Sequence, residues 1–141
     1  MQRCRKVTGA LDSRNGGNTI PQLAFVCLGV VSQLYDTGPH PEVRAAQLQP
    51  QLMRPERYSN FERAKQAYAI AAAMPHLVDG LYCHCDCEGH SGHYSLLDCY
   101  ASDHAAACDV CMKEVEIAFA MSQDGATLDD IRSELNRVYG T

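Results

Sequence analysis

A chain of 141 residues that is 46% hydrophobic and 21% charged is long enough for one ordinary domain and too short for two large ones. Its net charge of −5 is unevenly distributed: residues 1–65 carry nine Lys and Arg against five Asp and Glu, whereas residues 79–116 carry eight acidic side chains against Lys113 alone. An acidic segment repels phosphate backbones and attracts cations, so the composition excludes nucleic acid as the expected partner and favours a metal ion.

The N-terminal region, residues 1–55, is expected to be a mostly irregular leader or extension. It holds a glycine pair, several prolines and no sustained helical period. Basic residues precede the apolar run Leu23–Val31, which contains Cys27 and has the outline of a secretory signal. Pro21, which stands between the basic residues and this run, argues against such a signal. No stretch approaches the roughly 20 apolar residues of a membrane span. Two locations therefore stay open, an exported or membrane-anchored one and the cytoplasm.

The ordered domain is expected over residues 56–141 and is predicted to be all-α, because strand signals are nearly absent. A capping box at Ser59–Glu62 predicts a helix that ends at Met74–Pro75, and Pro75 predicts a short second helix to residue 81. Residues 88–92 should form a loop, and residues 95–100 a helical piece with Ser95 as N-cap. Further helices are predicted over 108–121, with Val115, Ala118, Phe119 and Met121 inward, and from Thr127, with Leu128, Ile131, Leu135 and Val138 on one face.

Cysteine and histidine concentrate in one segment. Six of the eight cysteines and four of the six histidines lie between Cys83 and Cys111. The segment contains a C-x-C-x-C run, then Cys99, then a C-x-x-C pair. These spacings allow thiolates to converge on one ion, and sulfur with imidazole selects zinc, copper(I) or an iron–sulfur cluster. A domain of roughly 80 residues also has a small core that commonly needs a metal or disulfide staple.

The segment from Met74 to Arg132 resembles a bacterial family named for its cysteines, the PCYCGC-motif or CYCXC (seleno)proteins. The family pattern is a C-x-C-x-C turn, then H-x-S-L-x-x-C-[FY], then H-x-x-x-C-x-x-C at the start of a helix. The matching residues are Cys83, Cys85, Cys87, His93, Ser95, Leu96, Cys99, Tyr100, His104, Cys108 and Cys111. Tyr82 stands where the family motif has proline. The resemblance covers about residues 66–140.

This resemblance, together with the spacing, implies eight metal ligands: Cys83, Cys85, Cys87, His93, Cys99, His104, Cys108 and Cys111. The expected cofactor is one or two zinc or copper(I) ions in a structural or metal-handling site, with an iron–sulfur cluster as the weaker choice. His84 and His90 are expected to be exposed loop histidines, and His40 to face solvent. His76 is expected to lie at the surface or to support a metal ligand through a hydrogen bond. Asp98 and Asp103 are expected to be solvated or to orient ligating histidines.

Other interpretations of the cysteines stay open at this point. In an exported protein the six thiols allow fifteen disulfide connectivities, although a Cys83–Cys85 bond would be strained. A thiol redox protein would use Cys108 and Cys111 at a helix N-terminus, but the βαβ pattern of thioredoxin-like proteins is missing. An enzyme is the less favoured class, because protein ligands fill every position of a closed zinc site and leave no activated water.

Overall fold

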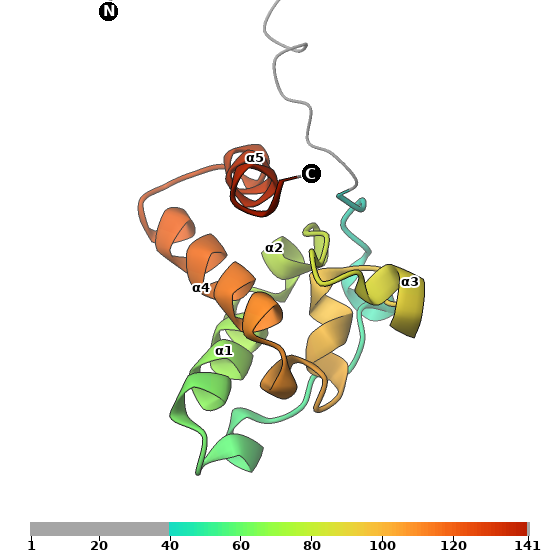
Figure 1. Ribbon diagram of the computed structural model, residues 1–141, viewed down its shortest axis with the longest axis vertical. Helices are drawn as coiled ribbons and strands as arrows, with labels where there is room; N and C mark the ends of the chain where they lie inside the picture. The colour runs from blue at the N-terminus through green and yellow to red at the C-terminus, as the bar shows by residue number, and fades with distance from the viewer. Residues whose placement is uncertain (1–39, 141) are drawn as a thin grey trace, which may run out of the picture. The chain divides into compact units, whose positions relative to one another are not determined.

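The structure is a computed structural model that describes residues 40–140, and every regular element in this part of the chain is helical (Figure 1). The α-helices are α1 (Glu62–Ala73), α2 (Pro75–Asp79), α3 (Cys87–Ser91), α4 (Asp109–Gln123) and α5 (Leu128–Tyr139). Short 3-10 helices are η2 (Ala46–Leu48), η3 (Pro55–Tyr58), η4 (Leu96–Ala101) and η5 (Ala105–Ala107). The all-α prediction is confirmed, with no strand between residues 40 and 140. None of these helices combines the length and apolar character that a bilayer span requires.

Two tyrosines form the centre of the core. Helix α1 packs against α4, and α5 contacts α4 (Figure 1). Tyr68 on α1 and Tyr100 on η4 are buried, with ring centroids 4.9 Å apart in an edge-to-face arrangement. The Tyr100 hydroxyl donates a 2.8 Å hydrogen bond to the carbonyl oxygen of Cys111. The aromatic core is thus joined directly to the backbone of the cysteine-rich region.

Helix ends follow the predicted signals in part. Thr127 and Asp130 form a reciprocal capping box at the start of α5, and Met74 ends α1 as predicted. The capping box at Ser59 does not form. Pro55 starts a separate turn, η3, and the Ser59 amide donates to the Glu56 carbonyl at the end of that turn. Since Ser59 closes η3, α1 begins three residues later without a side-chain cap.

The predicted loop over residues 88–92 is wrong, because Cys87–Ser91 forms the short helix α3. Gly92, with φ of 66°, is its left-handed C-cap. One predicted core position is also wrong, because Phe119 is 37% exposed. The buried residues of α4 lie in its first three turns and include the charged Glu114, and the burial does not extend to Phe119.

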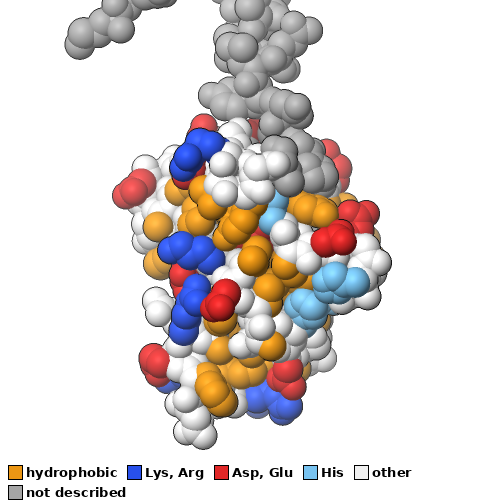
Figure 2. Space-filling view, in the orientation of Figure 1, with side chains coloured by type: hydrophobic (Ala, Val, Ile, Leu, Met, Phe, Trp, Pro, Cys, Tyr) orange, Lys and Arg blue, Asp and Glu red, His pale blue; other side chains and the backbone are white. Residues whose placement is uncertain are grey.

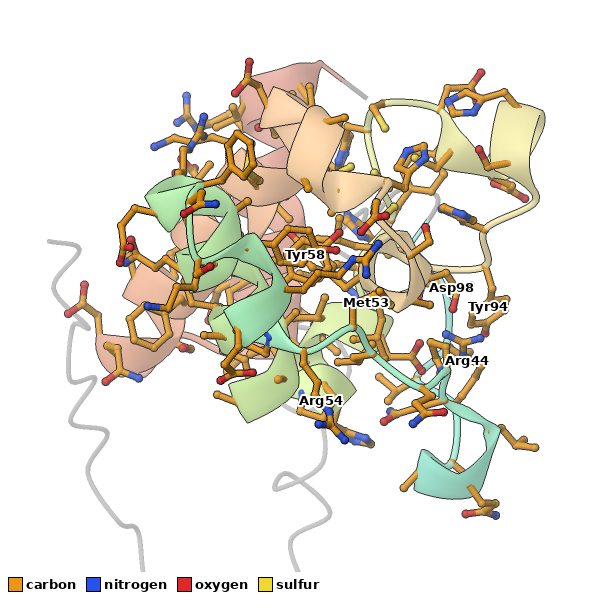
Figure 3. All side chains as sticks on the ribbon, turned by 90° about the horizontal axis from the view of Figure 1, so that it is seen from below. Arg44, Met53, Arg54, Tyr58, Tyr94 and Asp98 are labelled. Atoms are coloured by element: carbon orange, nitrogen blue, oxygen red, sulfur yellow. The ribbon has the colours of Figure 1, made fainter. Side chains whose placement is uncertain are left out.

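Residues 40–54 contain little regular structure but are tightly held. Arg44 bonds to the buried carboxylate of Asp79 and to Asp98, and its guanidinium lies 4.7 Å from the centre of the Tyr94 ring (Figure 3). The Arg132 side chain donates to the carbonyl of Pro41. The division into an extension (1–55) and a domain (56–141) stays a proposal. The Leu23–Val31 run with Cys27, which has the outline of a secretory signal, lies outside the described residues.

Candidate metal centre

Three cysteines converge because the chain reverses between them. In the cysteine turn, residues 83–87, Asp86 adopts the left-handed conformation with φ of 60° and ψ of 36°. This conformation is uncommon outside glycine but is tolerated better by Asp than by most residues. It brings the Cys85 Sγ to 2.8 Å from the Cys87 Sγ, while the Cys83 Sγ lies 3.6 Å from Cys87. The sequence predicted the C-x-C-x-C turn but gave no special role to Asp86 within it.

Two further sulfurs come from separate elements. Cys111, in the first turn of α4, places its Sγ 3.4 Å from that of Cys83. Cys99, on η4, places its Sγ 3.5 Å from that of Cys87. All four side chains are 0–3% exposed. A tetrahedral zinc site with Zn–S bonds of about 2.3 Å has sulfur–sulfur edges of about 3.8 Å, so this buried group is near the size that such an ion requires.

Two histidines adjoin the sulfurs. The Nε2 atom of His104 lies 3.0 Å from the Cys87 Sγ, and the Nδ1 atom of His93 lies 3.2 Å from the Cys99 Sγ. The two imidazole rings have centroids 5.0 Å apart. Both side chains are half-buried, so they cover the sulfurs on one side.

The described residues contain three groups of four potential ligand atoms, each group within 4.8 Å. Cys87 belongs to all three groups, while Cys99, His104 and Cys111 each belong to two. The groups are Cys83/Cys87/Cys99/Cys111, Cys85/Cys87/His104/Cys111 and Cys87/His93/Cys99/His104. Seven of the eight predicted ligands are therefore brought together around one sulfur.

Cys108 is the predicted ligand that none of these groups includes. Its half-buried side chain is the N-cap of α4, and its Sγ accepts the backbone N–H of Cys111 at 3.4 Å. Its position as a ligand stays a prediction.

Four thiols of the centre have a raised pKa in the absence of a cation, those of Cys83, Cys85, Cys99 and Cys111. All six cysteines among residues 40–140 are free. The pKa of Cys83 is raised well above its usual value by the adjacent Cys111 sulfur and by burial. Crowded sulfurs that cannot all carry negative charge are stabilised by a bound cation, which replaces their protons. The arrangement is thus suited to a metal ion that enters as protons leave.

His84 does not face solvent as predicted. Its side chain is 2% exposed, and its Nδ1 atom lies 2.5 Å from Oε1 of the fully buried Glu114. Its Nε2 atom lies 3.2 Å from Oδ1 of Asn136. Burial alone lowers the pKa of His84, but the Glu114 contact outweighs it and the net shift is upward. Glu114 on α4 and Asn136 on α5 thus hold the His84 ring in its buried position.

The other histidines and acidic residues agree with the predictions only in part. His76 and His90 are exposed, as predicted. His40 is half-buried instead, because its Nδ1 accepts the N–H of Tyr82 at 2.9 Å. Asp98 bonds to Arg44 and Asp103 to Arg57, so both serve ion pairs.

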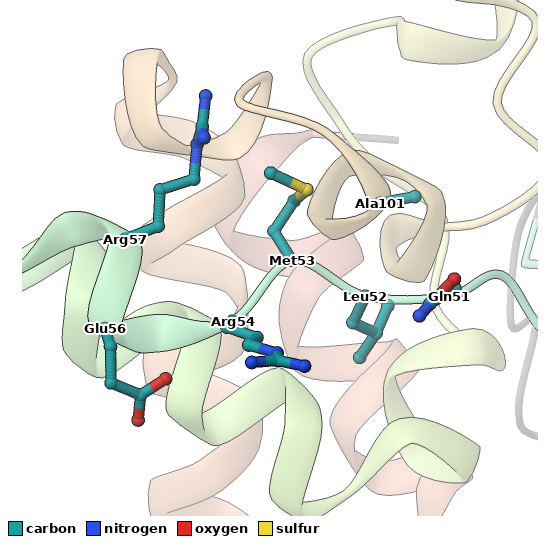
Figure 4. A pocket seen from close by; sticks show the side chains of 7 residues that line it. All are labelled: Gln51, Leu52, Met53, Arg54, Glu56, Arg57 and Ala101. Carbon is teal, nitrogen blue, oxygen red and sulfur yellow. The ribbon is translucent and has the colours of Figure 1, made fainter.

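An open pocket of about 750 Å³ lies elsewhere, lined by residues 51–54, Glu56, Arg57 and Ala101 (Figure 4). None of its lining residues belongs to the Cys/His groups, so it takes no part in the candidate centre.

Comparison with known proteins supports the pattern seen in the sequence. No curated protein and no solved structure matches the chain. A family of proteins of unknown function with a PCYCGC motif matches residues 42–141. The motif cysteines correspond to Cys83, Cys85 and Cys87, which places its tyrosine at His84 and its glycine at the left-handed Asp86. Because the match spans most of the chain and includes the residues of the candidate centre, the protein belongs to this PCYCGC-motif family.

Proposed function

We propose that this protein binds soft metal ions, zinc or copper(I), in a centre with more than one ion that shares the sulfur of Cys87. The observation that supports the proposal is the position of this sulfur, which lies within 3.6 Å of the ligand atoms of Cys83, Cys85, Cys99 and His104. Thiolates with imidazole are the donors that zinc and copper(I) prefer. Thiolate sulfur can also bridge two such ions.

Ligand and charge counting favour this bridged arrangement. Two four-coordinate ions have eight coordination positions, and the three groups supply seven different residues. A ligand that binds both ions would fill the eighth position, and Cys87 is the residue common to every group. Five thiolates carry a charge of −5, which two zinc ions reduce to −1. The buried centre would thus be close to electrically neutral when it is full.

Metal binding at the centre would also hold several elements of the fold together. Its ligands come from the cysteine turn, from η4, from His104 at the start of η5 and from α4. The ions held by these residues would fix elements that otherwise meet through a small core, so metal binding and folding should be coupled. On the histidine side, His93, His104 and Cys85 remain partly accessible. This accessible edge favours a metal-handling role over a purely structural one.

A thiol redox protein is the second candidate, and the 2.8 Å approach of the Cys85 and Cys87 sulfurs favours it. A redox nucleophile, however, needs a lowered thiol pKa. Here the pKa of Cys85 is raised by burial and by its contact with Cys87. Metal binding therefore remains the better-supported function.

Elemental analysis of protein purified without oxygen tests the proposal, together with its absorbance spectrum. We expect at least two zinc or copper ions per chain and no visible bands from iron. A metal-free protein with three disulfides would contradict the proposal. Iron with broad visible absorbance would indicate an iron–sulfur electron carrier.

A further inference from the structure

One face of the centre is formed by imidazoles with graded exposure. We call His90, His93 and His104 the imidazole face. His90 is exposed and the other two are half-buried, whereas Cys87 and Cys99 beneath them are 0% exposed. Figure 2 shows histidine side chains at the surface beside acidic ones, on the side where α3 lies. From His90 inward, the potential ligand atoms thus change from exposed nitrogen to buried sulfur.

His90 has the hydrogen bonds of a metal-ligating histidine. Its Nε2 atom lies 3.2 Å from the carbonyl oxygen of Cys85, which can only accept, so Nε2 carries the proton and donates it. The Nδ1 atom then has the lone pair, and the Ser91 hydroxyl covers it at 2.8 Å. Histidines that bind metals commonly donate their other N–H to a backbone carbonyl in this way. The carbonyl here belongs to a residue of the centre itself.

The position of His90 connects the surface with the sulfurs. Its ring is stacked on that of His104, with centroids 5.8 Å apart and an interplanar angle of 26°. Rotation of the exposed His90 side chain can shorten this separation. His104 in turn lies 3.0 Å from the Cys87 sulfur. The exposed carboxylates of Asp86 and Glu88 on the same short segment attract cations to it.

We propose that His90 is the outer ligand of a metal port, which captures a soft ion at the surface and passes it through His104 to the Cys87 sulfur. This inference rests on the proposed function. The ion exchanges one nitrogen ligand for another and then for sulfur, and the thiol that binds it releases its proton to solvent, so the oxidation state of the ion does not change. In the filled centre His90 returns to its contacts with Cys85 and Ser91 and is not a resident ligand.

Stopped-flow loading of the full chain tests the port. Zinc held by a chromophoric chelator, and copper(I) held by bicinchoninate, are transferred to metal-free protein, and the release of the chelator is followed. His90→Asn should slow loading about tenfold, since it removes the first ligand and not the final ones. His76→Asn, at another exposed histidine, should load at the wild-type rate. Ser91→Ala, which uncovers Nδ1, should load at least as fast as wild type.

Stoichiometry and affinity separate the outcomes. Unchanged ion number and affinity in a slow His90→Asn variant would support the port. Wild-type loading rates in that variant would overturn it, and so would the loss of a bound ion, since His90 would then be a resident ligand. Failure of the wild-type protein to take up either metal would instead contradict the proposed function.

Discussion

Arg44 forms a two-pronged ion pair with Asp79 across 35 residues of chain, with its Nη2 and Nε atoms 2.5 and 2.9 Å from Oδ1. The Asp79 side chain is fully buried and also accepts a hydrogen bond from Ser95. Arg44 lowers the pKa of Asp79 and outweighs the opposing effect of burial. An irregular segment ahead of α1 is thereby fixed to the end of α2 and to η4.

Loss of this pair should destabilise the protein strongly. Arg44→Met leaves the Asp79 carboxylate buried without its cation, and we expect the free energy of unfolding to fall by about 3 kcal/mol. Chemical denaturation followed by circular dichroism measures the change. The control is Arg57→Met, which removes an exposed ion pair with Asp103 and should have little effect. Equal effects of the two substitutions would show that the Arg44 segment does not stabilise the domain.

The stability of the metal-free protein should depend on His40 in mild acid. Burial lowers the pKa of His40 from 6.5 to about 4, and its Nδ1 must be unprotonated to accept the Tyr82 N–H. A histidine whose pKa is lower in the folded state stabilises the fold above the unfolded pKa, and this contribution is lost as pH falls from 6.5 towards 4. His84 titrates in the opposite sense, because its pKa is raised.

We therefore expect His40→Gln to be less stable than wild type at pH 7, with a difference that shrinks as the pH approaches 4. Thermal melts of both metal-free proteins between pH 4 and 7 measure it. A difference that is constant over this range would mean that His40 does not titrate with folding.

Replacing Asp86 with glycine, the residue at this position of the family motif, should stabilise the protein. Its φ of 60° costs an ordinary residue roughly 1–2 kcal/mol, which glycine avoids. Asp86→Gly should therefore raise the melting temperature, and Asp86→Ala should lower it, since alanine tolerates this conformation less well than aspartate. If both variants melted at the same temperature, backbone conformation would not be the factor that selects this residue.

Replacing only one residue of the buried His84–Glu114 pair should destabilise the protein. His84→Tyr introduces the residue of the family motif but leaves the Glu114 carboxylate uncompensated, at a cost of about 3 kcal/mol. The double variant His84→Tyr/Glu114→Leu should recover much of this loss. Denaturation of the single and double variants gives their coupling energy, and additive effects would show that the two residues act independently.

Local signals predicted much of the fold. The helix start at Thr127, the proline after Met74 and the C-x-C-x-C spacing each depend on a few neighbouring residues, and the structure reproduces them. The predictions were wrong where contacts between residues far apart in the sequence determine the burial of a side chain. His84 is buried because Glu114, thirty residues away, needs a partner, and His40 is held by Tyr82 and Asn136. The spacing gathered the sulfurs, but only the three-dimensional arrangement identifies Cys87 as their common centre.

Native mass spectrometry of anaerobically loaded protein tests the central role of Cys87 most directly, with Cys87→Ser compared against Cys85→Ser. The shared sulfur belongs to all three ligand groups and the Cys85 sulfur to one. We predict at least two zinc or copper(I) ions in the wild-type protein, loss of more than one ion in Cys87→Ser, and loss of at most one in Cys85→Ser. A wild-type protein that binds no metal, or equal losses in the two variants, would contradict the account.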